Sequence, residues 1–128
     1  MMTKILCMAA AGAVGTLARA GLSALLQRAA GPGFPWGTAG VNLLGCFLFG
    51  LVWAVTEHGF RSAADVRLVV LTGFMGAFTT FSTFVFECGE LGQTGRYAAC
   101  IANVALQNVF GLACLFVGMA LGRAVGPA

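Results

Sequence analysis

Four long apolar runs alternate with three short polar segments along this chain. The runs extend over residues 5–26, 38–55, 66–88 and 97–121. Each is close to the roughly 20 apolar residues that a helix needs to cross a bilayer. The pattern predicts an all-α integral membrane protein with four transmembrane helices, in which residues 1–128 form a single membrane domain.

The segments between the runs are rich in turn-forming residues. Residues 27–37 include Pro32, Pro35 and three glycines, and we expect them to form a loop. Residues 57–65 and 89–96 form the second and third connections. An even number of spans places both termini on the same side of the membrane.

The third run has a weak helix interior. Gly73 and Gly76 are followed by four hydroxyl residues within five positions, at residues 79–83. Such residues weaken a helix, and lipid tolerates an unwound backbone only where protein buries it or where it lines a cavity. We therefore predict that the third helix is broken in mid-span, between Gly76 and Thr80.

Composition supports a lipid environment. The chain is 59% hydrophobic and 9% charged, with a mean hydropathy of +0.93, whereas an average soluble protein is about a quarter charged. The length leaves no room for a separate catalytic domain. The first run follows Lys4 as a secretory signal would, but it continues to Leu26 with Arg19 inside it, so we interpret it as a retained helix.

Small residues are frequent inside the apolar runs. Many of the 19 glycines lie there, and small residues let helices approach closely in lipid. We expect a tightly packed bundle and an oligomer, because four thin helices alone make a poor pore. The five cysteines have no metal-binding spacing and are expected to pack as small hydrophobes.

The basic residues are nearly balanced between the two sides of the membrane. The formal net charge is +3. Only a clear excess of Lys and Arg in short loops fixes the orientation of a membrane protein. Either the termini are cytoplasmic, or the orientation is nearly undetermined and protomers insert both ways. The side of the termini has Lys4, Arg61, Arg67 and Arg123, whereas the other side has Arg28 and Arg96, with Arg19 nearby.

Neutral polar side chains are concentrated inside three of the runs. Asn42 lies in the second run, and Asn103 and Gln107 lie one turn apart on one face of the fourth. Polar groups at membrane depth are costly. They therefore either hydrogen-bond the helices together or line a path for an anion or water. The hydroxyl residues in the centre of the third run are Thr79, Thr80, Ser82 and Thr83.

Phenylalanines recur every third residue beside these hydroxyls. Phe78, Phe81 and Phe84 predict one aromatic stripe, which can simply pack in the core or face lipid. A phenyl ring, however, is negative on its face and positive at its edge. Ring edges beside amide and hydroxyl donors suit a small anion that must shed water and still leave quickly.

The remaining reactive residues give little support to an enzyme. His58 lies in a loop without a second metal ligand, and Ser82 has no internal base to activate it. Arg19 either reaches toward the nearby loop, pairs with an acid or a carbonyl, or attracts anions into a vestibule. Glu87 and Glu90 end the third run and are expected to be wet or interfacial, with proton coupling at Glu87 as the alternative.

Three segments resemble a known family. The segment Gly73–Phe84, GFMGAFTTFSTF, resembles the third-span signature of the Fluc/CrcB fluoride channels. The segment Gly37–Gly45 is similar to the GT..VN..G segment of that family. The first run adds Gly12 and Gly15 followed by Arg19, as the family does. The resemblance covers essentially the entire chain in order and length.

This resemblance implies a dual-topology homodimer of antiparallel protomers in the cell inner membrane. Its two pores would export cytoplasmic fluoride passively and confer fluoride resistance, without enzymatic activity. The backbone carbonyls of Gly76 and Thr79 from both protomers would hold a central structural Na+, and Arg19 would have a vestibule or structural role. The resemblance assigns the fluoride pore to Phe81, Phe84, Asn42, Thr80, Ser82, Thr83, Asn103 and Gln107.

Two other functions are compatible with four short spans. A proton-coupled transporter of the small multidrug resistance type also forms antiparallel dimers, but it uses a carboxylate deep in the first span, and the first run here contains no acid. A non-transporting assembly subunit would use the glycines and amides only for packing.

Overall fold

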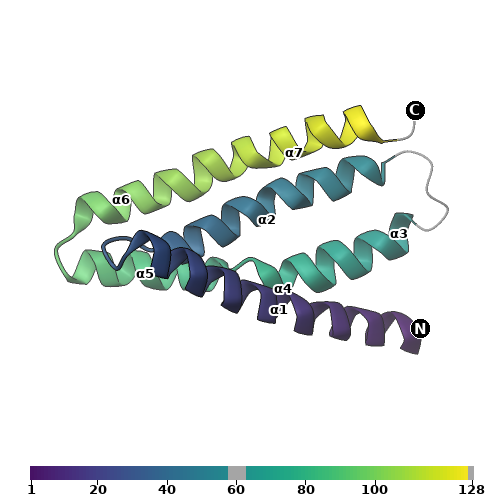
Figure 1. Ribbon diagram of the computed structural model, residues 1–128, viewed down its shortest axis with the longest axis horizontal. Helices are drawn as coiled ribbons and strands as arrows, with labels where there is room; N and C mark the ends of the chain where they lie inside the picture. Colours follow the sequence, from purple (N-terminus) through teal and green to yellow (C-terminus); the bar gives the residue numbers. More distant parts are fainter. Residues whose placement is uncertain (58–62, 127–128) are drawn as a thin grey trace.

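The computed structural model describes residues 1–57 and 63–126, which form four helical rods alongside one another (Figure 1). His58 and Arg61, singled out above, lie outside the described residues. All four rods are long and apolar enough to cross a membrane, so the predicted four-helix fold is confirmed. The first two rods are α1 (Met2–Ala30) and α2 (Trp36–Val55). The third rod consists of α3 (Ala63–Val66), the π-helix η1 (Arg67–Met75), α4 (Gly76–Phe78) and α5 (Phe81–Gln93). The fourth rod consists of α6 (Tyr97–Ala105), the π-helix η2 (Leu106–Phe110) and α7 (Gly111–Val125).

The first residues of α1 and the last residues of α7 lie at the same end of the bundle, as an even number of spans requires (Figure 1). Charged side chains near this end form two ion pairs. Lys4 pairs with Asp65, and Arg123 Nε lies 3.6 Å from Glu57 Oε2. Charged groups near the ends of membrane-spanning helices can reach the interface, where a charge costs less than at the centre of the bilayer.

The first connection is shorter than predicted. Gln27 remains helical, and its Nε2 donates to the carbonyls of Gly31 at 2.6 Å and Phe34 at 3.0 Å. The Gly37 N–H donates to Gln27 Oε1 at 3.0 Å. Gly31 has a φ of 85°, a left-handed conformation that favours glycine. The predicted loop was wrong at both ends, because one glutamine side chain supplies the hydrogen bonds of a tighter turn.

Glycine allows two pairs of rods to approach closely. A Cβ atom at Gly50 in α2 or at Gly118 in α7 would collide with the backbone of the facing helix. A Cβ atom at Gly15 would likewise collide with the Phe74 carbonyl, where α1 packs on the third rod. Helices without side chains at their crossing points gain van der Waals contact, which is what holds helices together in lipid.

The third rod is interrupted between α4 and α5, inside the predicted region. Thr79 (φ −84°, ψ 157°) and Thr80 (φ −146°, ψ 110°) are extended, so the helix stops and restarts within the apolar span. The Oγ1 atom of Thr80 accepts the Thr83 N–H at 3.2 Å and so caps α5. Threonine is β-branched and favours extended backbone, and its hydroxyl accepts a hydrogen bond from the first turn of the new helix.

Candidate ion-conducting site

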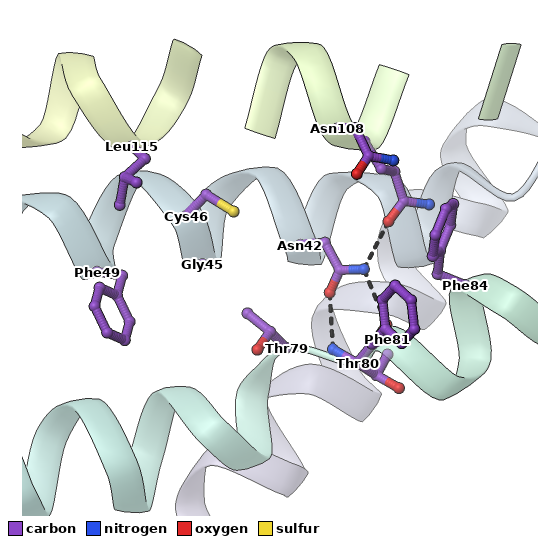
Figure 2. A pocket seen from close by; sticks show the side chains of 11 residues that line it. Asn42, Gly45, Cys46, Phe49, Thr79, Thr80, Phe81, Phe84, Asn108 and Leu115 are labelled. Atoms are coloured by element: carbon purple, nitrogen blue, oxygen red, sulfur yellow. Dashed lines mark hydrogen bonds between the residues drawn. The ribbon is translucent and has the colours of Figure 1, made fainter. Parts of the chain in front are cut away.

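A cavity of about 280 Å³ lies beside the break in the third rod (Figure 2). Side-chain amides, phenyl rings and the backbone of the break form its wall, and they come from α2, α5, η2, α7 and the residues between α4 and α5. The cavity brings together five of the residues predicted for the pore, namely Asn42, Thr80, Phe81, Phe84 and Gln107.

Asn42 bridges α2 to the break. Its Oδ1 accepts the Thr80 N–H at 2.8 Å, and its Nδ2 donates to the Thr80 carbonyl at 3.0 Å. Figure 2 shows Asn42 directed from its helix toward Thr80. Thr80 lies outside α4, so its N–H has no helical partner, whereas its carbonyl, at the N-cap position of α5, is the acceptor with which that helix begins. One side-chain amide therefore supplies the pairing that the broken backbone lacks.

Asn42 also begins a chain of three amides. A further Nδ2 bond goes to Gln107 Oε1 at 2.6 Å. Gln107 Nε2 donates to Asn103 Oδ1 at 2.9 Å, so Asn103 and Gln107 share a face as their spacing predicted. Asn103 is fully buried, and its Nδ2 donates to Cys88 Sγ at 3.3 Å. The chain connects α2, η2, α6 and α5, and it leaves neither N–H of Asn42 free.

Phe81 and Phe84 form an aromatic part of the cavity wall. Their ring centroids are 5.6 Å apart and their planes are tilted by 53°. Phe84 is buried, whereas Phe81 is 75% exposed in the single chain. The predicted stripe was wrong for Phe78, which is buried and stacks on Phe74. The break explains the difference, because it interrupts the helical phase between Phe78 and Phe81.

The hydroxyl groups of the third rod cluster around Thr80. Its Oγ1 lies 2.9 Å from Thr83 Oγ1 and 3.3 Å from Ser82 Oγ. Among the residues predicted for the pore, Thr80 lines the cavity, whereas Ser82, Thr83 and Asn103 are not part of its wall. Asn103 instead accepts a hydrogen bond from Gln107, which does line the cavity.

Thr80 also lines a second hollow, of about 420 Å³, together with Thr83 and Arg19. The other polar side chains in its wall include Thr38 and Ser23. Among the described residues that line this hollow, Arg19 carries the only charge. A cation at the edge of a hollow lined by hydroxyls raises the local concentration of anions. The Glu87 carboxylate accepts a hydrogen bond from Thr38 behind this wall, so the vestibule role of Arg19 stays a prediction.

Glu87 is half-buried and lines an open hollow together with Glu90, so its wet or interfacial position stays a prediction. Thr38 Oγ1 donates to Glu87 Oε1 at 2.5 Å. The other oxygen, Oε2, is buried and has no hydrogen-bond partner within the described part of the chain. The prediction that Glu87 ends the third helix was wrong, because α5 continues to Gln93. Glu90, one turn later, is exposed as predicted.

A cation at the break would need backbone ligands. In residues 1–57 and 63–126 no group of three or more His, Cys, Asp or Glu side chains is placed to hold a metal. The Thr80 N–H, which would bond to the Gly76 carbonyl in a continuous helix, donates to Asn42 instead. The Thr83 N–H, the helical partner of the Thr79 carbonyl, donates to Thr80 Oγ1. Both carbonyls are thereby left available, and hard oxygen ligands suit Na+.

Sequence reasoning missed part of the cavity wall. Gly45, Cys46 and Phe49 also line the cavity, and they follow Asn42 by three, four and seven residues. Leu115 on α7 is a further lining residue. The signal for the first three was present, because residues at these spacings lie on one face of a helix. A polar residue at membrane depth thus indicates that the residues three, four and seven positions along its helix line the same cavity.

Known proteins resemble this chain over nearly all of its length. The family model described as CrcB-like protein, Camphor Resistance (CrcB), matches residues 6–119. The chain is 54% identical to a protein of Solidesulfovibrio magneticus, over 98% of this chain and 100% of the relative. It is 46% identical to a protein of Nitrosococcus oceani over the same shares. It is 52% identical to a protein of Nitratidesulfovibrio vulgaris, over 97% of this chain and 100% of the relative. Each of these three relatives is named fluoride-specific ion channel FluC.

Proposed function

This chain belongs to the CrcB family, whose relatives are named fluoride-specific ion channels, and from that premise we propose that it conducts fluoride passively across a membrane. The observation that carries the proposal is the meeting of amides and ring edges at one cavity, formed by Asn42, Gln107, Phe81 and Phe84. Positive ring edges and the N–H groups of Asn42, once released from their partners inside the protein, attract a small anion without the full positive charge that would hold it too tightly.

The proposed route passes from the second hollow to the cavity. Arg19 attracts the anion into the second hollow, and the hydroxyls of Thr80, Ser82 and Thr83 replace part of its water. The support for this order is Thr80, which lines both spaces. Asn103 acts from behind the wall by fixing Gln107.

The functional unit proposed is a homodimer of antiparallel protomers with two pores. Phe81 lines the cavity yet is 75% exposed in the single chain, so a second copy would complete the wall around it. In the most apolar 18-residue stretch of α1, only 6% of the residues are buried within the single chain, so most of this helix is free to contact lipid or a second copy. The near balance of basic residues between the two sides supports insertion in both orientations. In the cell inner membrane such a dimer would export cytoplasmic fluoride and confer resistance to it.

A structural Na+ is proposed at the centre of this dimer. Its ligands would be the Gly76 and Thr79 carbonyls of both copies, which the break frees from regular helical bonding. A cation there would stabilise the negative carbonyl end of the helix that stops at Phe78. It would take no part in conduction.

Ion efflux from liposomes tests the proposed function. Vesicles with the purified protein are loaded with potassium fluoride or potassium chloride, and valinomycin carries the compensating K+. A passive fluoride channel gives fast fluoride efflux and no chloride efflux, and a protonophore leaves the rate unchanged. Protein-free vesicles measure the background leak of HF.

Other outcomes would favour the two rival functions. Efflux that depends on an imposed proton gradient would identify a proton-coupled transporter, and Glu87, with one buried oxygen, would be the carboxylate to examine. No efflux from folded protein would make an assembly subunit the better description.

A further inference from the structure

We propose that the Gln107 side chain competes with the anion for Asn42. When the cavity holds no fluoride, the Gln107 carbonyl occupies an Asn42 N–H, and an arriving fluoride displaces it. The inference rests on the proposed function and concerns how the cavity regulates the binding of its own ion.

The hydrogen bonds of Asn42 carry this inference. Nδ2 has two hydrogens, and both are used inside the protein, one by the Thr80 carbonyl at 3.0 Å and one by Gln107 Oε1 at 2.6 Å. The bond to Thr80 belongs to the two-point pairing that holds the break. The bond to Gln107 is therefore the one that Asn42 can give up without disturbing the third rod.

Gln107 is built so that one end is fixed and the other faces the cavity. Its Nε2 is bonded to Asn103, which is fully buried. Its Oε1 points to Asn42 at the cavity wall. The residue lies in the π-helix η2, and such segments are frequent at functional sites. The Nε2 bond to Asn103 therefore holds the side chain in place, while Oε1 can release Asn42 when fluoride arrives.

The Gln107 carbonyl gives Asn42 a hydrogen-bond partner while the cavity holds no fluoride. An N–H group without a partner in a poorly hydrated space is unfavourable, so a bare Asn42 donor would bind fluoride tightly and release it slowly. When the neutral Gln107 carbonyl already accepts this Asn42 N–H, fluoride must replace an existing hydrogen bond, and the net free energy of fluoride binding is smaller. Conduction needs binding that is strong enough for entry and weak enough for exit.

The alternative role for Gln107 is that of a direct fluoride ligand through its amide N–H. The two roles predict changes of opposite sign when the side-chain amide is removed. Loss of a ligand weakens fluoride binding, whereas loss of a competitor strengthens it.

Gln107→Met is the decisive variant, because methionine has a similar length and no strong acceptor. We expect the half-saturating fluoride concentration for liposome efflux to fall roughly two- to tenfold, the range that corresponds to one hydrogen bond. The maximal rate should fall as well, since the ion leaves more slowly. Gln107→Leu is a second variant with the same expectation. Gln93→Met makes the same exchange at an exposed position at the end of α5 and should leave both quantities unchanged.

Each other outcome overturns the proposal. A rise in the half-saturating concentration makes Gln107 a ligand, and no change means that its carbonyl does not compete. Failure of both variants to fold as wild type, judged by size-exclusion chromatography, would show that the bonds of Gln107 to Asn42 and Asn103 are structural and that its amide is not displaceable. Absence of fluoride efflux from the wild-type protein would instead overturn the proposed function, and this inference with it.

Discussion

Asn42 pairs with both backbone groups of Thr80, accepting its N–H at 2.8 Å and donating to its carbonyl at 3.0 Å. The second rod thereby supplies a partner for the Thr80 N–H, which the third rod leaves without a helical bond where it breaks. An unpaired backbone group is especially costly at membrane depth, where little water is available. The break and the polar residue opposite it thus form one structural unit.

Substitution of Asn42 by alanine is expected to damage both stability and conduction. The Thr80 N–H would lose its partner, and a buried polar group left unpaired costs about 1–3 kcal/mol. We expect the free energy of unfolding to fall by about that amount, as measured by denaturation in detergent, and fluoride efflux to fall strongly.

Asn108→Ala provides the control for stability. Asn108 also lines the cavity, so it is a control for stability and not for conduction. Its Nδ2 donates to the Val104 carbonyl of the same rod at 2.8 Å, and its side chain is exposed. Its loss should change the free energy of unfolding by less than about 0.5 kcal/mol. Equal stability of Asn42→Ala and wild type would show that the break does not depend on Asn42.

Local sequence predicted the break but not its consequences. Gly76 and the hydroxyl residues after it indicated where the helix is weak, and the break lies at Thr79 and Thr80. The partner of Thr80 comes from 38 residues earlier, and no local pattern specifies a contact between distant helices. The aromatic stripe failed at Phe78 for a related reason, because helical spacing holds only within a continuous helix.

The same limit applies to the charged residues. Glu87 follows an apolar run in the sequence, so its pattern is that of a helix end, yet α5 continues to Gln93 and Thr38 donates to the carboxylate. Gln27 precedes a segment rich in glycine and proline, yet its side chain holds that turn together. In both cases a side-chain contact between rods or within a turn, rather than local composition, determines the result.

Removal of either cavity ring is expected to slow fluoride efflux. Phe81→Ile and Phe84→Ile keep an apolar side chain but lose the positive ring edge. The interaction of a ring edge is worth on the order of 1 kcal/mol, which corresponds to a change in rate of roughly fivefold. Fluoride efflux from liposomes measures the effect. Chloride efflux should remain absent in both variants.

Phe86→Ile is the matched control for the rings. Phe86 lies on the same helix, is 65% exposed and is not part of the cavity wall. Its substitution should leave the efflux rate within roughly twofold of wild type, since side chains away from the site seldom matter. If all three isoleucine variants conduct equally well, the ion does not pass Phe81 and Phe84.

A methyl group at Gly118 is expected to separate α2 from α7. The Cβ atom of Gly118→Ala would collide with the Phe47 carbonyl and lie 3.0 Å from the Leu51 nitrogen. Backbone atoms cannot move aside as a flexible side chain can, and overpacking typically costs about 1–3 kcal/mol. We expect a lower midpoint of thermal unfolding in detergent. Gly92→Ala, which meets nothing within 4 Å, should leave the midpoint unchanged or raise it slightly; equal midpoints for both variants would contradict the close packing.

Neutralisation of Arg19 is expected to slow fluoride entry in a way that depends on salt. Arg19 carries the only charge among the described residues that line the second hollow, and its field extends about 30 Å at 0.01 M ionic strength but only about 3 Å at 1 M. Arg19→Gln should therefore reduce efflux severalfold at low ionic strength, set with an impermeant salt, and the deficit should disappear at high ionic strength. Arg19→Lys retains the charge and should conduct as wild type at both ionic strengths. A deficit in Arg19→Gln of the same size at both ionic strengths would mean that Arg19 contributes packing or a fixed hydrogen bond, because only a long-range field is screened by salt.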